Sequence, residues 1–468
     1  MIFQIVKKEW SEILREGRFR VALGIALALL LVSVAISRNH YAHVQAQHQE
    51  AKENARNIWV SQDEKNPHSA AHYGTYAFKP KYPLSLIDQG VDKYAGISIF
   101  LEAHNRNEAQ YIAAADQTGL ARFGELTPDF ILLFILPLLA ILIAYDSFTR
   151  EREGGTLQLL KSQGLPGWKL ALGKWGGVSL PIYALAGGLF LVAAVLLGAL
   201  QDFGEFEPGH LLLLLAVYAA YFAIFINLAL VVSALSATSG ISLVASLAIW
   251  MLSCLAAPKA ASNLADTLHP YPTRQEFAEQ IAEDRKSGLD GHNPWNKEAQ
   301  LLQQQLLAEY GVDSVQQLPF NFDGYIMQKG EEHEAEIYYK HYALLKDQHE
   351  AQTRVYRAAA LASPFLPARF LSMAIARTDY QTHWDFSHAA EAYRVEMQNA
   401  LNSDFAQNST YGDWEYLADK SLWSSIPDFS YEPVEMGAVL NRNASNLLVL
   451  LLWLCGSFAG LFFVSRNL

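Results

Sequence analysis

Few residues in this chain of 468 amino acids have the types and spacing that enzyme chemistry requires. His333-Glu334 begins like a zinc-protease helix, but Ile337 stands one turn later, where that motif needs a second imidazole. A phosphate-binding loop needs Gly-x-x-x-x-Gly-Lys-Ser/Thr, and the Gly173-Lys174 pair is followed by Trp175. The sequence also lacks a Gly-x-Ser-x-Gly nucleophile elbow. We therefore expect no nucleotide hydrolysis or other catalysis by this chain.

Several histidines could be considered as metal ligands. His40, His43 and His48 lie close together in the sequence, and His341 and His349 lie on another expected helix. A metal site needs converging ligands and hydrogen bonds that orient them, and the sequence pattern indicates neither. Solvated helix faces account for these histidines, so we expect no metal site.

Six apolar runs divide the sequence. Each has close to the roughly 20 residues that a helix needs to cross a hydrocarbon core. They predict transmembrane helices at residues 20–37, 128–146, 175–200, 211–234, 240–257 and 446–465. The apolar centres of these runs contain no acidic side chain, which argues against an ion-coupled transporter. The two cysteines, Cys254 and Cys455, lie in the last two runs, so we expect no disulfide outside the membrane.

Lysine and arginine counts predict the orientation of the spans, because short basic segments stay in the cytoplasm. The basic residues are Lys7, Lys8, Arg15, Arg18 and Arg20 near the N-terminus, and Arg150, Arg152, Lys161, Lys169 and Lys174 in residues 147–174. The connection at 201–210 contains no lysine or arginine and has three acidic residues. We therefore expect both termini and residues 147–174 in the cytoplasm, and residues 38–127 and 258–444 on the opposite side.

The two long segments, 38–127 and 258–444, make up more than half of the chain and are too polar to cross the membrane. Their periodicity predicts helices at Gln275–Arg285, Lys297–Tyr310, Glu331–Leu361 and Ala389–Leu401, and loops at Asn66–His72, Gly288–Trp295 and Ser403–Trp414. The first span is expected to continue outward through residues 40–58 and to pack on Glu331–Leu361. The predicted fold is an all-α membrane protein with six transmembrane helices, an N-terminal interfacial helix, and one large, mainly helical extracytoplasmic domain made from two insertions.

Residues 147–174 hold the strongest functional signal. Thr156 can cap a short helix over Leu157–Gln163, and Gly164 and Pro166 would end it after about two turns. Such a helix is marginally stable alone and needs a partner surface. The expected apolar contact consists of Leu157, Leu159 and Leu160, and the expected charged rim consists of Arg150, Glu151, Arg152, Glu153 and Lys161.

Residues 1–19 have the pattern of an amphipathic helix at the inner membrane face. Its apolar residues recur at helical spacing and are Ile2, Val6, Trp10, Ile13 and Leu14. Glu9, Glu12 and Glu16 argue against a cleaved secretory signal, whose leading segment is basic. A simple lipid anchor is the alternative interpretation of this segment.

These two segments resemble the permease subunits of type-2 ABC transporters. The resemblance lies in Lys8-Glu9-Trp10-x-x-Ile13-Leu14-Arg15 and in Asp146…Arg150-Glu151-Arg152-Glu153-Gly154-Gly155-Thr156-Leu157…Leu160…Gly173-Lys174. It implies a coupling helix that contacts an ATPase and contains Glu151, Glu153, Gly154, Gly155, Thr156, Leu157, Leu160 and Lys161. It also implies an interfacial helix with Lys7, Trp10, Ile13, Leu14 and Arg15. The segment Ser363-Pro364…Thr378-Asp379…His383…Phe386…Glu391…Tyr393-Arg394 is similar to the subgroup with a large extracytoplasmic insertion between spans five and six.

The resemblance implies a multi-pass protein of the bacterial inner membrane that has no cofactor of its own. Its partners would be two copies of a separate ABC ATPase, which binds ATP and Mg, and a second permease that is identical or paralogous. The complex would either export a substrate or move the outer domain against an extracytoplasmic protein. A membrane-anchored receptor or assembly scaffold without an ATPase is the alternative. The net charge of −12 argues against a nucleic-acid partner.

Overall fold

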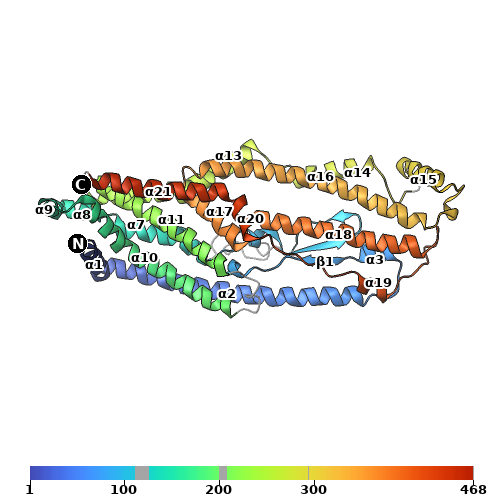
Figure 1. The fold of residues 1–468 in the computed structure, drawn as a ribbon, viewed down its shortest axis with the longest axis horizontal. Helices are drawn as coiled ribbons and strands as arrows, with labels where there is room; N and C mark the ends of the chain where they lie inside the picture. The colour runs from blue at the N-terminus through green and yellow to red at the C-terminus, as the bar shows by residue number, and fades with distance from the viewer. Residues whose placement is uncertain (111–125, 200–207, 294, 467–468) are drawn as a thin grey trace.

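The computed structural model describes residues 1–110, 126–199, 208–293 and 295–466. The molecule is a long rod of helices with both termini at one end (Figure 1). Among these described residues, six helices are long and apolar enough to cross a membrane: Phe19–Val60, Pro128–Glu153, Gly167–Gly198, Gly209–Leu235, Ser239–Leu268 and Ala444–Arg466. The predicted all-α membrane fold with six spans is therefore confirmed. Most of the predicted connection at 201–210 lies outside the described residues.

The half of the rod with the termini is the helix bundle. Its elements are α1 (Ile2–Arg15), the membrane part of α2 (Gly17–Val60), α6 (Pro128–Phe130), the π-helical turn η3 (Ile131–Ile135), α7 (Leu136–Ala144), α8 (Thr149–Glu153), α9 (Thr156–Ser162), α10 (Gly167–Gly198), α11 (Pro208–Leu235), α12 (Ser239–Met251), η5 (Leu252–Ala256), α13 (Ala257–Leu268) and α21 (Ala444–Arg466). Helix α10 begins well before the predicted span at 175–200, because Pro166 is its N-cap residue and Gly167 is already helical.

The other half is the distal domain, built from both long segments. Its elements are α3 (Pro67–Tyr73), β1 (Thr75–Phe78), η1 (Pro83–Leu86), α4 (Asp92–Ala95), β2 (Ser98–Glu102), β3 (Asn105–Arg106), α14 (Arg274–Lys286), α15 (Lys297–Tyr310), η6 (Val315–Gln317), α16 (Phe322–Ala359), α17 (Phe365–Ala376), α18 (Tyr380–Asn408), α19 (Lys420–Ser425) and α20 (Met436–Arg442). The antiparallel sheet has the order β1-β2-β3, with Thr75 opposite Leu101 and Leu101 opposite Arg106.

One hydrophobic core joins the two long segments in the distal domain. Trp59, Ala71 and Ile99 come from the first segment, and Phe386 and Trp423 from the second, and all are buried together. The Trp59 indole N–H donates to the Trp423 carbonyl oxygen at 3.0 Å. Neither segment could bury these side chains alone, which is what the prediction of one joint unit requires.

Three details of the distal domain differ from the sequence-based predictions. Helix α3 occupies the predicted loop Asn66–His72, because Asn66 caps it and Ala70 and Ala71 are buried in the core. Helix α18 runs through half of the predicted loop Ser403–Trp414. The predicted packing of residues 40–58 on α16 is wrong, since α18 and the sheet lie between α2 and α16 (Figure 1).

Helix α17 was not predicted, and it ties the distal domain to the bundle. Its residues Leu366, Leu371 and Ile375 are buried in the same core as the spans, against α11 and α21. The Tyr218 hydroxyl on α11 and the Ser372 hydroxyl on α17 are hydrogen-bonded at 2.8 Å. A movement of α11 must therefore displace α17, because close-packed interiors transmit strain.

Candidate functional site

Helix α1 lies in a shallow groove that three glycines create on α10. A Cβ atom at Gly173 would lie 2.6 Å from Ile5 Cβ, and one at Gly177 would lie 2.4 Å from Glu9 Cβ. These separations are far below van der Waals contact, so only glycine allows the two helices to approach so closely. Gly176 faces Val6 in the same way. The glycine pattern therefore fixes α1 against the third span.

A buried ion cluster holds α1, α8 and α10 together. Lys174 Nζ lies 2.8 Å from Glu9 Oε1 and 2.9 Å from Glu151 Oε1, and the Lys174 side chain is 0% exposed. Lys8 Nζ contacts Glu9 at 3.1 Å and Glu151 at 3.0 Å from the solvent side. Burial raises the pKa of Glu9, but Lys174 and Lys8 outweigh it and hold that pKa below its ordinary value. Glu9 is therefore ionised at neutral pH.

Charged side chains of α8 also form hydrogen bonds with α11 and α12. Arg152 donates to the Ser236 and Ala234 carbonyl oxygens at the end of α11, the latter at 2.7 Å. Glu153 accepts from Ser239 N at 3.0 Å and from Ser239 Oγ at 2.8 Å at the start of α12. Helix α8 therefore connects the fourth and fifth spans to α1 and α10.

The short helix α9 is mostly exposed to solvent. Its N-cap is Gly155 with φ 71°, and not Thr156 as predicted. Thr156 is the first helical residue, and its hydroxyl donates to the Glu151 carbonyl oxygen at 3.3 Å. Glycine fits this position because a left-handed φ strains other residues. The exposed face of α9 thus begins at an exposed Gly154-Gly155 turn.

The structure divides the predicted coupling residues into two groups. Glu151 and Leu157 are buried within the chain, and Leu157 is only 6% exposed, so neither can belong to an outer rim or contact face. Leu160 is half-buried against the bundle core. Leu159 is 58% exposed and is the apolar side chain that α9 presents to solvent. The exposed predicted residues are Glu153, Gly154, Gly155, Thr156 and Lys161.

The predicted residues of α1 also divide by burial. Ile13 is buried against the bundle and Trp10 is half-buried, whereas Leu14 is exposed. Lys7 and Arg15 are exposed and basic. Helix α1 therefore has one face on the protein, as well as an outer face with Phe3 and Leu14 that suits a bilayer surface.

A second ion cluster lies where the bundle meets the distal domain. Arg369 Nη1 on α17 contacts Asp88 Oδ1 at 2.9 Å and Asp129 Oδ2 at 2.7 Å. Ser372 Oγ donates to Asp88 Oδ2 at 2.5 Å, and Gly90 N donates to Asp88 Oδ1 at 2.9 Å. Burial, opposed by Arg369, raises the pKa of Asp88 to about 6. The cluster joins three segments that are far apart in the sequence.

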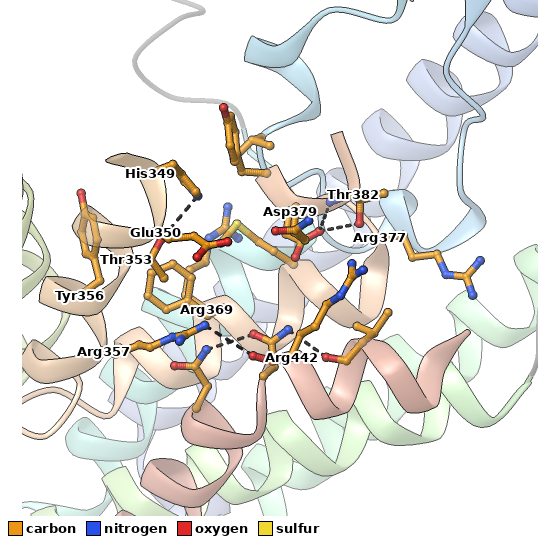
Figure 2. Close-up of a pocket in the computed structure, with 18 of the residues that line it drawn as sticks. His349, Glu350, Thr353, Tyr356, Arg357, Arg369, Arg377, Asp379, Thr382 and Arg442 are labelled. Atoms are coloured by element: carbon orange, nitrogen blue, oxygen red, sulfur yellow. Dashed lines mark hydrogen bonds between the residues drawn. The ribbon is translucent and has the colours of Figure 1, made fainter. Parts of the chain in front are cut away.

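A cavity of about 760 Å³ opens beside this cluster (Figure 2). Its charged lining comprises Lys346, Glu350, Arg354, Arg357, Arg369, Arg377, Asp379, Asp385 and Arg442. Six of these side chains are basic and three are acidic, but Arg369 is paired with Asp88 and Asp129, and Arg442 with Asp385. The volume is within the range of small-molecule sites. The sequence did not predict this cavity, because most of its lining comes from α16, α17, α18 and α20, which share no motif.

Comparison with known proteins identifies two regions of the chain. Residues 44–264 match the family described as ABC-2 family transporter protein, and residues 274–432 match DUF3526, a domain of unknown function. A probable ABC transporter permease protein NosY from Pseudomonas aeruginosa is 41% identical over 119 residues, which are 22% of this chain and 41% of that protein. NosY from Stutzerimonas stutzeri is 43% identical over 65 residues, which are 14% of this chain and 20% of that protein.

The chain thus spans less than half of the length of these curated relatives. The family match nevertheless covers the second to fifth spans, including α8, α9 and the glycine-lined part of α10. Together with the six apolar helices, these matches show a multi-pass membrane protein. Residues 44–264 are thus similar to the ABC-2 family of transporter proteins, and both curated relatives are probable ABC transporter permeases.

Proposed function

We propose that this chain is the membrane subunit through which a separate ABC ATPase drives substrate export or movement of the distal domain. Two ATPase chains, which bind ATP and Mg, would act on two permeases, with this chain as one of them. The matched family and the permease relatives support a subunit of this kind. Any extracytoplasmic protein partner would contact the distal domain.

The observation that carries the proposal is the position of α9. Contacts within the chain fasten α8 to α1, α10, α11 and α12. They are made by the charged side chains of Arg150, Glu151, Arg152, Glu153 and Lys174. Helix α9 stands at the extreme end of the rod (Figure 1), and its Leu159 side chain is exposed there. A force applied to α9 would therefore pass to α8 and reach these four elements of the bundle through short ion pairs and hydrogen bonds.

The orientation proposed is that this end faces the cytoplasm of a bacterial cell. The basic residues of α1, α8 and α9 gather there with both termini, as the positive-inside rule requires. Single cysteines at Ser162 and Ser287, in a Cys254→Ala/Cys455→Ala background, test this orientation because both positions are exposed. In intact cells an impermeant maleimide should label only the Ser287 position. Labelling of both positions would contradict the topology.

The ATPase contact is tested with Leu159→Asp. A charge on the exposed leucine should abolish co-purification with the ATPase and stimulation of ATP hydrolysis, because a seven-residue helix has few apolar contacts. The matched control is Leu417→Asp in the distal domain, where the leucine is 54% exposed. Unchanged ATPase association in Leu159→Asp would remove α9 as the docking element. Failure of the unmodified chain to bind any ABC ATPase would favour a membrane-anchored receptor or scaffold.

Movement of the distal domain is the favoured output, because rigid elements cross the junction. Helix α2 runs without a break for 44 residues from the bundle into the distal domain. Helix α17 is packed into the bundle core and is ionically bound to Asp88 and Asp129. Inserting three glycines after Gln47 of α2 should leave ATP hydrolysis intact but reduce ATP-dependent distance changes between labels on the two halves. Unchanged distances in that variant would favour export without domain movement.

A further inference from the structure

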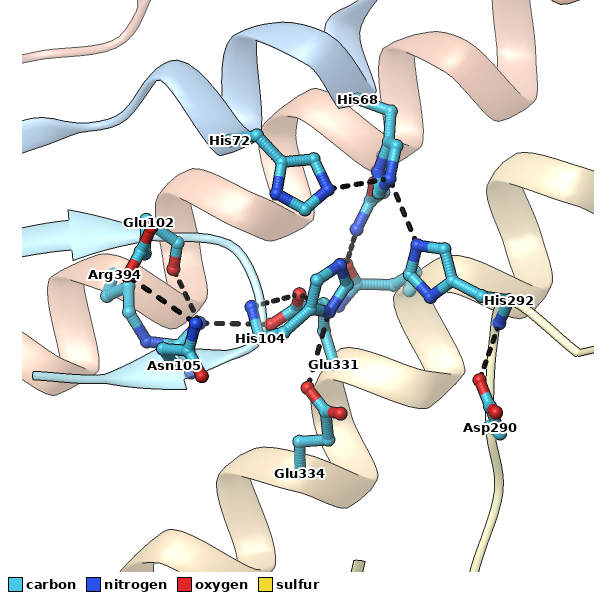
Figure 3. A network of polar contacts seen from close by, with 12 residues as sticks. His68, His72, Glu102, His104, Asn105, Asp290, His292, Glu331, Glu334 and Arg394 are labelled. Carbon is cyan, nitrogen blue, oxygen red and sulfur yellow. Dashed lines mark hydrogen bonds and ion pairs between the residues drawn. The ribbon is translucent and has the colours of Figure 1, made fainter.

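We propose that the distal domain binds one late first-row divalent transition-metal ion, of the Zn²⁺ or Cu²⁺ class, through His68, His72, His104 and His292. Ligand nitrogen atoms of these four imidazoles all lie within 4.8 Å of one another (Figure 3). These residues differ from the histidines that the sequence brought to attention, and no family match assigns a role to them. The site is distinct from the proposed ATPase contact, which lies at the opposite end of the rod.

His68 and His72 are brought together by α3. They are four residues apart, so one turn of helix places them on the same face. The helix is fixed at its start by Pro67 and by the Asn66 side chain, which accepts from His68 N at 2.9 Å. Their Nε2 atoms are 3.1 Å apart. The pair is therefore preorganised rather than mobile on a loop.

His292 reaches the same point from the second long segment. It lies in the loop between α14 and α15, and its backbone N–H donates to Asp290 Oδ1 at 2.9 Å. The loop rests directly on α16, since a Cβ at Gly291 would lie 2.8 Å from the Ile326 carbonyl oxygen. This close approach places His292 Nε2 3.0 Å from His68 Nε2.

His104 is held by a carboxylate on its other ring nitrogen. It occupies the β2–β3 turn with φ 64°, a conformation that is costly for a residue other than glycine. Its Nδ1 lies 2.6 Å from Glu331 Oε1 and 3.3 Å from Glu334 Oε2. Glu331 is in turn fixed by Arg394, whose Nη1 lies 3.0 Å from Glu331 Oε2. A carboxylate on Nδ1 leaves Nε2 for a metal ion, which is the usual support for a metal-binding histidine.

Hydrogen bonding among the imidazoles leaves the cluster unsatisfied. His68 Nε2 faces both His72 Nε2 and His292 Nε2, although it has a single proton or a single lone pair. Buried His104 Nε2 has no hydrogen-bond partner among the described residues. A cation among these nitrogens would satisfy all of them at once. Four nitrogens at 2.0–2.1 Å from Zn²⁺ are roughly 3.3 Å apart in a tetrahedron, so modest side-chain movements would complete the site.

The donor set decides the class of ion. Neutral imidazoles suit Zn²⁺, Cu²⁺ and Ni²⁺, whereas Mg²⁺ and Ca²⁺ need oxygen ligands. His72 and His292 are exposed, so an ion can enter from solvent. An ion bound here would link α3 and the β2–β3 turn of the first segment to the α14–α15 loop of the second. It would thereby brace the distal domain.

The proposal is tested by metal binding to the full-length protein, purified in detergent with a histidine-free affinity tag and stripped with EDTA. Equilibrium dialysis against Zn²⁺ should load about one ion per chain more tightly than Mg²⁺. Cu²⁺ in the same protein should show nitrogen hyperfine structure by electron paramagnetic resonance. Zn²⁺ should raise the unfolding temperature, because it binds the folded state preferentially.

Replacing two exposed ligands, His72→Ala with His292→Ala, should weaken Zn²⁺ affinity by at least about 100-fold and abolish the thermal shift. The matched control His43→Ala removes an exposed histidine outside the cluster and should bind like the unmodified protein. Circular dichroism checks folding, and His292→Ala alone, which lies on a loop, replaces the double variant if the latter misfolds. The proposal is overturned if the unmodified chain binds neither Zn²⁺ nor Cu²⁺, or if the ligand variants bind as tightly as His43→Ala.

Discussion

The buried cluster around Lys174 gives the sharpest prediction about how α1 is held. Replacing Lys174 with Met keeps the length of the side chain but leaves Glu9 and Glu151 facing each other without their central cation. Both carboxylates are almost fully buried, with side chains 3% and 8% exposed. Repulsion between them should push α1 away from α10 and α8.

The free-energy cost of the substitution depends on the ionic contacts that remain around Glu9 and Glu151. Removing one partner of a buried ion pair costs about 3–5 kcal/mol. Lys8 still contacts both carboxylates, but its side chain is 44% exposed and replaces only part of the lost interaction. We therefore expect a loss at the lower end, about 3 kcal/mol. This corresponds to a change of roughly 100-fold in the equilibrium between docked and detached α1.

Amide hydrogen exchange of α1, measured by mass spectrometry in detergent, is the direct assay. Exchange in residues 2–15 should accelerate by roughly 100-fold in Lys174→Met, whereas α16 should be unchanged. The triple variant Lys174→Met/Glu9→Gln/Glu151→Gln removes the unpaired charges and should recover most of the protection. The reasoning is refuted if Lys174→Met leaves α1 protected, or if the triple variant exchanges as fast as the single one.

Two further predictions concern the same contact. Gly177→Ala should detach α1, because the new Cβ would collide with Glu9. In the control Gly187→Ala nothing lies within 4 Å of the new Cβ, so the hydrogen exchange of α1 should be unchanged or slower. Equal effects of the two variants on α1 would show that the glycine groove is unimportant. The lowered pKa of Glu9 means that its stabilising contribution is complete above the ordinary glutamate value of about 4.3 and is lost as pH falls through the lower folded value. Protection of α1 in the unmodified protein should therefore fall below about pH 4, and a Glu9→Gln variant with the same pH dependence would contradict this.

Local patterns in the sequence were sufficient for the spans and for several helices. Helix α15 has the predicted bounds Lys297–Tyr310, and α14 differs from its prediction by one residue at each end. The six apolar runs predicted the six membrane-length helices. These features depend on hydrophobicity and periodicity over a single element, which are visible without knowing the neighbours. The coupling role of residues 146–174 stays a prediction, which the sequence makes because charge and glycine are concentrated there.

Contacts between helices that are far apart in the sequence could not be predicted from the periodicity of a single element. Glu151 was assigned to an exposed rim, but it is buried because Lys174 and Lys8 meet it from two other helices. Leu157 and Leu159 are indistinguishable by residue type, and only the direction in which α9 lies on the bundle decides that the first is buried and the second exposed. The exposed apolar side chain of α9 is therefore Leu159 rather than Leu157.

The histidines show most clearly what sequence spacing predicts and what depends on tertiary packing. The sequence drew attention to His40, His43 and His48, which are neighbours along the chain. The cluster in the structure instead unites His68 with His292, which are 224 residues apart, through a helix that was predicted as a loop. Sequence spacing determines what one helix turn brings together, whereas convergence of separate segments depends on packing of the whole chain. Tertiary structure alone therefore decided where the imidazoles, the ion clusters and the cavity lie.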